Sequence, residues 1–253
     1  MKKVLVLIVS VLAFMPSVLF AESNNFGISG MDVFWGYAPI NGYVQTPAGG
    51  KLGTSDIKRP TFDELGIEKE NLLNLELRWV NKKYLAYIGS TWINMSSSGV
   101  LEKDLMSRTQ FFEGERFNTD INFNWYRFGV GRNLGYFTPK VEVAILDFSY
   151  ELSTPSTRIE RSYAKPTLRV GVEKQIKFNN FGLDLESSIS LPASNTPTIF
   201  TAGAVFKYWF TKRFNLGLVV NYLYIDYEDN QEFPNHLRLE MLPITGISLG
   251  YAF

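Results

Sequence analysis

Cysteine is absent from this chain of 253 residues. Its absence excludes disulfide bonds, thiolate metal ligands, a cysteine nucleophile and a lipidated cysteine at the N-terminus. Histidine is nearly absent too, because His236 is its only representative, and the formal net charge is zero. Nucleic-acid binding needs an excess of basic residues, which the chain lacks. We therefore expect no cofactor, no metal site and no nucleic-acid partner.

Long apolar runs are scarce and lie at the N-terminus. Lys2 and Lys3 precede the uncharged apolar stretch Val4–Phe14, and a small residue, Ala21, follows shortly after. This pattern predicts a secretory signal peptide over residues 1–21, cleaved before Glu22, and one domain over residues 22–253. A transmembrane anchor is the alternative, but the stretch is short of the ~20 apolar residues that a spanning helix needs. From Glu22 onward no run approaches that length, which excludes a helical membrane protein.

Aromatic residues, in contrast, are abundant: 20 Phe, 13 Tyr and 5 Trp. Many of them flank short polar segments in pairs, namely Trp79 and Tyr84, Tyr136 and Phe137, Phe178 and Phe181, and Phe210 and Phe214. Aromatic side chains gather at membrane–water interfaces, where one end of the ring is apolar and the other is hydrated. The pairs therefore favour a protein with membrane interfaces.

Apolar and polar residues alternate with a period of two, which predicts β-strands. Leu73, Leu75 and Leu77 share one face of such a segment, and Glu76 and Arg78 share the other. Repetition of the pattern predicts ten strands, near residues 26–45, 72–80, 84–95, 116–132, 137–152, 163–177, 181–192, 199–210, 214–227 and 237–253. Eight or twelve strands remain alternatives. A soluble sandwich would alternate similarly, but the long strands and aromatic flanks favour a transmembrane antiparallel up-and-down β-barrel.

The connections alternate in length, as in such barrels. Short turns are expected near residues 81–83, 133–135, 179–180 and 211–213. Longer polar loops are expected near 46–71, 96–115, 153–162 and 228–236, with a shorter one near 193–198. An even number of strands places both termini at the end with the short turns. In a bacterial outer membrane this end is periplasmic and the long loops are extracellular.

The last strand carries a motif. Leu249, Tyr251 and Phe253 alternate, and the sequence stops on the aromatic Phe253. This resembles the C-terminal assembly signal of bacterial outer-membrane β-barrel proteins, although Ser248 stands where a glycine is common. The resemblance implies an outer-membrane location in a Gram-negative cell envelope. It also implies two partners, outer-membrane lipid and the outer-membrane assembly machinery.

If the apolar faces contact lipid, the polar faces line the barrel. The residues expected to line it are Glu76, Arg78, Asp120, Arg169, Glu173, Asp184, Glu186, Lys207, Arg238 and Glu240. A barrel of about ten strands is largely filled by its own side chains. Charges in so narrow a space should pair, since an unpaired buried charge is costly. This favours a structural or interaction protein with a filled lumen, and a narrow solute or cation-preferring pore is the alternative.

The predicted strand 137–152 carries apolar and charged residues on one face. Val141, Val143 and Ile145 share that face with Asp147 and Glu151, which suggests a β-bulge in this strand.

His236 is the only residue that suggests an enzyme. Outer-membrane hydrolases use histidine beside serine or carboxylates, and Asp226 and Glu228 lie near His236 in the sequence. The omptin proteases have an Asp–His pair on one strand opposite an aspartate pair, whereas here Asn235 precedes His236. We therefore predict no catalytic residue, and hydrolysis of lipid or peptide through His236 is the less favoured alternative.

The 46–71 loop contains a sequence typical of a local turn. Thr61 and Glu64 have the spacing of a capping box, and Gly66 follows as a terminator. Phe62 and Leu65 would then lie on one face and pack against something. The alternatives are a loop that seals the barrel, a lid, and a surface for a partner.

Overall fold

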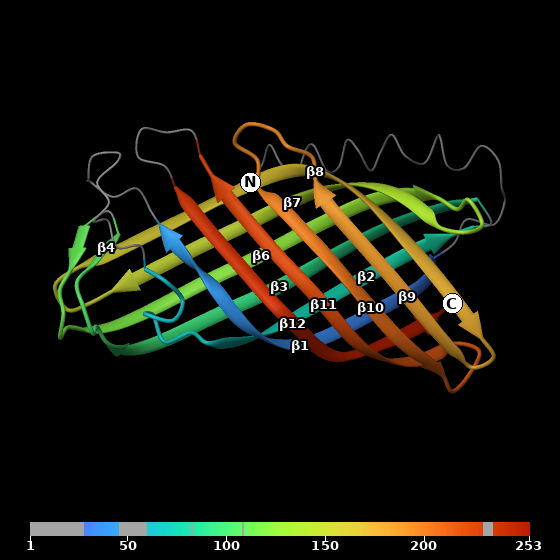
Figure 1. The fold of residues 1–253 in the computed structure, drawn as a ribbon, viewed down its shortest axis with the longest axis horizontal. Coiled ribbons are helices and arrows are strands. Elements are labelled where there is room, and N and C mark those ends of the chain that lie inside the picture. Colours follow the sequence, from blue (N-terminus) through green and yellow to red (C-terminus); the bar gives the residue numbers. More distant parts are fainter. Residues whose placement is uncertain (1–27, 46–59, 82, 108, 230–234) are drawn as a thin grey trace.

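The computed structural model describes residues 28–45, 60–81, 83–107, 109–229 and 235–253. In these ranges ten long strands form one closed antiparallel barrel, in the order β1-β12-β11-β10-β9-β8-β7-β6-β3-β2 (Figure 1). The ten are β1 (Ile28–Gln45), β2 (Lys69–Val80), β3 (Tyr84–Val100), β6 (Arg116–Arg132), β7 (Thr138–Ser153), β8 (Arg158–Phe178), β9 (Phe181–Ser190), β10 (Thr198–Trp209), β11 (Phe214–Glu228) and β12 (His236–Ala252). The predicted fold class and strand number are confirmed. The described residues contain no helix long and apolar enough to cross a membrane.

The first and last strands close the barrel. β1 and β12 pair antiparallel from Gly30 opposite Ala252 to Gln45 opposite His236. The start of β1 and the end of β12 therefore lie at the barrel end that carries the short turns, called here the turn end. The opposite end, called the loop end, carries the longer connections (Figure 1). There the short strands β4 (Leu105–Ser107) and β5 (Thr109–Phe111) form a hairpin that the sequence did not predict.

An apolar band covers the outside of the barrel next to the turn end. On β9 and just beyond it the outward side chains run from Phe181 through Leu185 and Ile189 to Leu191, all well exposed. Exposed apolar residues on the other strands continue the band, among them Trp35, Tyr37, Leu73, Ile88, Tyr126, Val141, Leu168, Val172, Phe206, Leu216, Leu218, Ile247 and Leu249. Its extent along β9, from Phe181 to Leu191, matches the ~9–11 tilted residues that cross a bilayer. We call it the lipid band.

Toward the loop end the apolar face of the wall points into the barrel and the polar face points out. Phe117, Ile121, Phe123 and Trp125 on β6 are buried in the hydrophobic core inside the barrel, and Asp120 between them is exposed outside. Because Asp120 was expected to line the lumen, this apolar face was expected to contact lipid, and that expectation was wrong. β6 is longer than the lipid band is tall, so beyond the band its outer face lies in a polar environment and its inner face packs in a core. We call this part the extension of the barrel.

β7 crosses from the lipid band into the extension without a β-bulge. Its register with both β6 and β8 is continuous. Val141, Val143 and Ile145 face outward within the band, and Asp147 and Glu151 face outward beyond it. The expected bulge was therefore wrong. The change from apolar to charged residues on one face marks the edge of the band instead.

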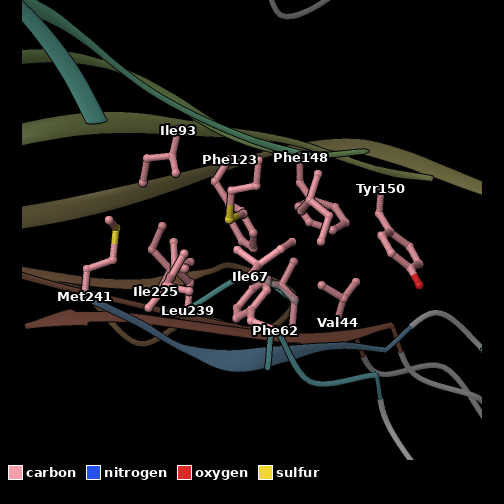
Figure 2. Close-up of a cluster of buried hydrophobic side chains, with 14 of the residues drawn as sticks. Val44, Phe62, Ile67, Ile93, Phe123, Phe148, Tyr150, Ile225, Leu239 and Met241 are labelled. Carbon is pink, nitrogen blue, oxygen red and sulfur yellow. The ribbon is translucent and has the colours of Figure 1, made fainter. Parts of the chain in front are cut away.

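A turn at residues 61–66 fills the interior of the extension. The capping box is confirmed: the Glu64 amide donates to Thr61 Oγ1 at 3.2 Å and the Thr61 amide donates to Glu64 Oε2 at 3.1 Å. Gly66 ends the turn with a φ of 67°, a conformation that side chains disfavour. Phe62 and Leu65 are fully buried. In Figure 2, Phe62 and Ile67 lie between one wall of the barrel and the opposite wall that carries Leu239.

Backbone hydrogen bonds hold this turn against β1. The Val44 amide donates to the Pro60 carbonyl at 2.9 Å, and the Phe62 amide donates to the Gly42 carbonyl at 3.2 Å. An ion pair between Lys103 and Glu64 joins the turn to the β3–β6 connection. This connection contributes Leu105 and other buried side chains to the same core. Of the three alternatives for the loop, the described part has the geometry of the first, a seal inside the barrel.

Candidate functional site: the barrel interior

Charged side chains fill the lumen on the turn-end side of the apolar core. Glu76 and Arg78 project from the inner face of β2, where Leu73, Leu75 and Leu77 face out. Further inward charges come from β6, β7, β8 and β9, so that one network of ion pairs joins five strands. Its members are Glu76, Arg78, Arg127, Lys140, Glu173 and Glu186. The separate ion pair Glu142–Arg169 lies beside them, and Tyr87 connects the two groups, because its hydroxyl bonds Glu142 and its ring lies 5.1 Å from Lys140 Nζ. We call these eight charged residues together the lumenal charge network.

Arg78 and Lys140 are the cations that bridge several carboxylates of this network. Arg78 Nε lies 2.6 Å from Glu76 Oε1, and its Nη1 lies 3.2 Å from Glu173 Oε2. Lys140 Nζ lies 2.5 Å from Glu186 Oε1 and 3.9 Å from Glu173 Oε2. Glu173 is therefore shared by an arginine and a lysine. Such sharing compensates the loss of hydration that each charge suffers in the lumen.

Arg169 and Glu142 form the most deeply buried pair. The exposed fractions of their side chains are 0% and 1%, and the Arg169 guanidinium donates to Glu142 Oε1. Arg169 Nη2 also donates to Thr201 Oγ1 at 2.7 Å. The Tyr87 hydroxyl donates to Glu142 Oε2 at 2.5 Å. Both oxygens of Glu142 thus have a partner, as a buried carboxylate requires.

Glycine at position 129 makes room for the Tyr87 ring. A β-carbon built on Gly129 would lie 2.3 Å from Tyr87 Cζ. Gly129 and Tyr87 are directly opposite on β6 and β3, so the ring lies flat over the glycine. The contact between Tyr87 and Glu142 therefore depends on the absence of a side chain at this point of the wall.

A second, smaller charge cluster lies across the lumen. Lys207 Nζ is 3.0 Å from Asp32 Oδ1 and 2.9 Å from Asp184 Oδ2. The three residues come from β10, β1 and β9, and the pairing between β10 and β1 crosses the intervening strands β11 and β12 through the interior. Together with the larger network this gives six carboxylates and five cationic side chains. The interior is nearly balanced in charge.

A cavity of about 150 Å³ separates the charges from the apolar core. Along β2 its lining extends from Leu72 to Arg78. Phe34, Trp125 and Ile244 contribute to its apolar side, and Asp184, Glu186 and Lys207 contribute to its polar side. Its volume suffices for several water molecules. Because Phe34, Trp125 and Ile244 belong to the hydrophobic core, the cavity ends against packed apolar side chains on the loop-end side.

The structure brings together seven of the ten lumen residues expected from the sequence. These are Glu76, Arg78, Arg169, Glu173, Asp184, Glu186 and Lys207. The other three, Asp120, Arg238 and Glu240, lie on the outer face of the extension, which corrects the expectation for them. Their strands turn an apolar face inward beyond the lipid band, so the alternate polar face points out. Arg238 there stacks on the Tyr224 ring at 5.1 Å, and Glu240 accepts a hydrogen bond from Tyr222 at 2.9 Å.

Sequence reasoning missed five interior residues: Asp32, Tyr87, Arg127, Lys140 and Glu142. A signal for two of them was present. Lys140 and Glu142 alternate with Val141 and Val143, and the two valines had been assigned to an apolar face. Arg127 carried a misleading signal, because it shares parity with Phe123 and Trp125. Those aromatic residues had been assigned to the lipid side.

His236 lies on the outer face of the extension near the loop end. Its Nε2 is 3.0 Å from the Tyr43 hydroxyl and 3.1 Å from Asp226 Oδ1, and its Nδ1 is 3.7 Å from Glu228 Oε2. The buried residues Leu237 and Leu239 point into the core, so His236 points away from it. The cluster links β1, β11 and β12 at the rim.

Comparison with solved structures agrees with this architecture. The outer-membrane protease OmpT from Escherichia coli superposes with a TM-score of 0.56 at 8% identity, covering 92% of this chain and 99% of OmpT. The chain has the fold of a bacterial outer-membrane β-barrel. Ail from Yersinia pestis gives a TM-score of 0.42 at 12% identity, covering 90% of this chain and all of Ail. The transport unit of the autotransporter AIDA-I from Escherichia coli gives 0.43 at 9% identity, covering 93% and 94%.

No protein-family model matches the chain, and no curated protein matches it. At 8% identity the likeness to OmpT concerns the fold alone. The role of this barrel therefore depends on its own residues.

Proposed function

We propose that this protein is a non-enzymatic, non-conducting barrel of the bacterial outer membrane that presents an ordered extension at the cell surface. In this proposal residues 22–253 follow a cleaved signal peptide. The turn end and both termini are periplasmic, and the loop end is extracellular. The lipid band contacts membrane lipid. Leu249, Tyr251 and Phe253 form the recognition signal for the assembly machinery.

The observation that carries the proposal is the packed interior of the extension. Phe62, Leu65 and Ile67 fill it between opposite walls, and each is at most 3% exposed. An ion that entered the polar cavity from the turn end would meet this apolar core. Transfer of a charge into such packing costs several kcal/mol even after relaxation. The lumenal charge network adds to the closure, because its charges are paired with one another.

Conductance in a planar lipid bilayer tests the proposal. We expect the refolded chain from Glu22 to Phe253 to give no discrete openings, with folding established by a β-rich circular dichroism spectrum. A Glu186→Gln variant, altered in the lumen, is expected to be equally silent. Reproducible openings of the wild type would refute the proposal. A cation preference that changes in Glu186→Gln would then establish the narrow pore.

Enzymatic hydrolysis through His236 is tested separately. We expect the wild type and His236→Ala to show the same background rates on phospholipid and peptide substrates in detergent. The physical role of His236 is to hold Tyr43 and Asp226, so His236→Ala should lose about 1 kcal/mol of stability. Tyr43→Phe is the matched control, because it breaks one of the same contacts and keeps the imidazole. Hydrolysis by the wild type that disappears in His236→Ala and persists in Tyr43→Phe would establish catalysis.

A further inference from the structure

One part of the outer face of the extension combines amide, carboxylate and aromatic side chains. Where β3, β6 and β7 leave the lipid band, Trp92, Asn124 and Asp147 are directly opposite one another. One step farther from the band, Asn94, Asn122 and Ser149 form the next row. All six alternate with buried inward residues, so they share the outer face.

Aromatic rings border this polar surface on the side of the band. Tyr126 is two residues from Asn124 on the same face and is 41% exposed. It lies between Ser90 and Ile145, which belong to the edge of the band. Trp92 is half-buried at the same edge. The rings therefore lie beside amide and carboxylate groups on the outer wall.

Polar groups of this surface keep capacity for a ligand. Asn122 Nδ2 donates to Ser149 Oγ at 3.0 Å, which leaves its oxygen as an acceptor. Asn94 and Asp147 are exposed. Neither row holds a lysine or an arginine on β3, β6 or β7. A phosphate group, which prefers cationic partners, has little reason to bind there.

We infer that Trp92, Asn94, Asn122, Asn124, Tyr126 and Asp147 form a saccharide-binding face for the sugar headgroup of an outer-leaflet glycolipid. Vicinal sugar hydroxyls need groups that donate and accept in one plane, as amides and carboxylates do. The C–H face of a sugar ring packs on aromatic rings, which offer an apolar surface beside a polar one. The face is continuous with the lipid band, so the layer next to it is the headgroup layer of the same membrane.

This inference rests on the proposed position of the band in the outer membrane. The conductance experiment does not involve the outer face, so either proposal can fail alone. Asn41 on β1 provides a matched control, because it is an exposed outward amide just beyond the exposed Tyr37 of the band. Asn41 lies opposite Glu240 on β12, away from the asparagines of β3 and β6.

Isothermal titration in detergent micelles tests the saccharide face with the complete chain. The probes are lipopolysaccharide with its core sugars, lipid A without these sugars, and the free core oligosaccharide. We expect lipopolysaccharide to bind the wild type most tightly. Asn124→Ala with Asp147→Ala should weaken binding about ten-fold, and Asn41→Ala should leave it unchanged.

Three results would overturn the inference. Equal binding of lipid A would assign recognition to phosphates or acyl chains. Equal binding of the free oligosaccharide would assign the face to soluble sugars and remove the glycolipid. Unchanged affinity in the double variant, with circular dichroism showing a folded barrel, would remove these residues from any site. If the double variant fails to fold, Asn94→Ala alone is titrated, with an expected loss of about three-fold.

Discussion

Replacement of Arg169 by methionine is expected to lower the free energy of unfolding by about 3–5 kcal/mol. The substitution removes the cation that neutralises Glu142, and that carboxylate is 1% exposed. Glu142 keeps the hydrogen bond from Tyr87, which cannot replace a positive charge. Urea titration of the barrel in lipid vesicles, followed by tryptophan fluorescence, measures the loss.

An exposed Arg–Glu ion pair of the same chain provides the control for this prediction. Arg158 pairs with Glu151 at 3.0 Å, but the exposed fractions of these side chains are 64% and 30%. Arg158→Met is therefore expected to cost no more than about 1 kcal/mol. The Glu142→Gln, Arg169→Met double variant should lose less than the sum of the single losses. Equal losses in Arg158→Met and Arg169→Met would contradict a buried ion pair.

Replacement of Phe62 by alanine is expected to lower the free energy of unfolding by about 3–5 kcal/mol, the second large effect. Phe62 is fully buried and meets Phe123 with ring centroids 6.2 Å apart. The turn that carries it is held by backbone hydrogen bonds to β1, so the core cannot easily collapse into the space left behind. The same urea titration measures this loss.

Phe112 serves as the control for Phe62. It lies in the β3–β6 connection near the same end of the barrel, and it is 51% exposed. Phe112→Ala should change stability by about 0.5 kcal/mol or less. If Phe62→Ala were equally mild, the 61–66 turn would not be part of the core. The interior of the extension would then be looser than the packing indicates.

Most of the architecture followed from the sequence, because strands and turns are local properties. Two-residue alternation locates a strand wherever it lies, so the predicted segments 116–132 and 214–227 nearly coincide with β6 and β11. The capping box at Thr61 and Glu64 was equally local. The β4–β5 hairpin was missed because its strands are three residues long, too short for alternation to show.

The direction of each face was the part that the sequence could not provide. Alternation separates two faces but does not say which one lies inside. Within the lipid band the apolar face is outside, and in the extension it is inside. Strands such as β6 pass through both environments without any change of register. Asp120, Arg238 and Glu240 were misplaced for this reason.

The closing pair β1–β12 has a consequence for how the barrel is made. Gly30 on β1 is paired with Ala252 on β12, so closure joins the two most distant strands in sequence. Contacts of such long range slow folding, because the chain between them must be ordered first. Until β12 is in place, β1 has a free edge, and a membrane interior tolerates no free edge. Each molecule must therefore stay unfolded or chaperoned until its final strand has been delivered.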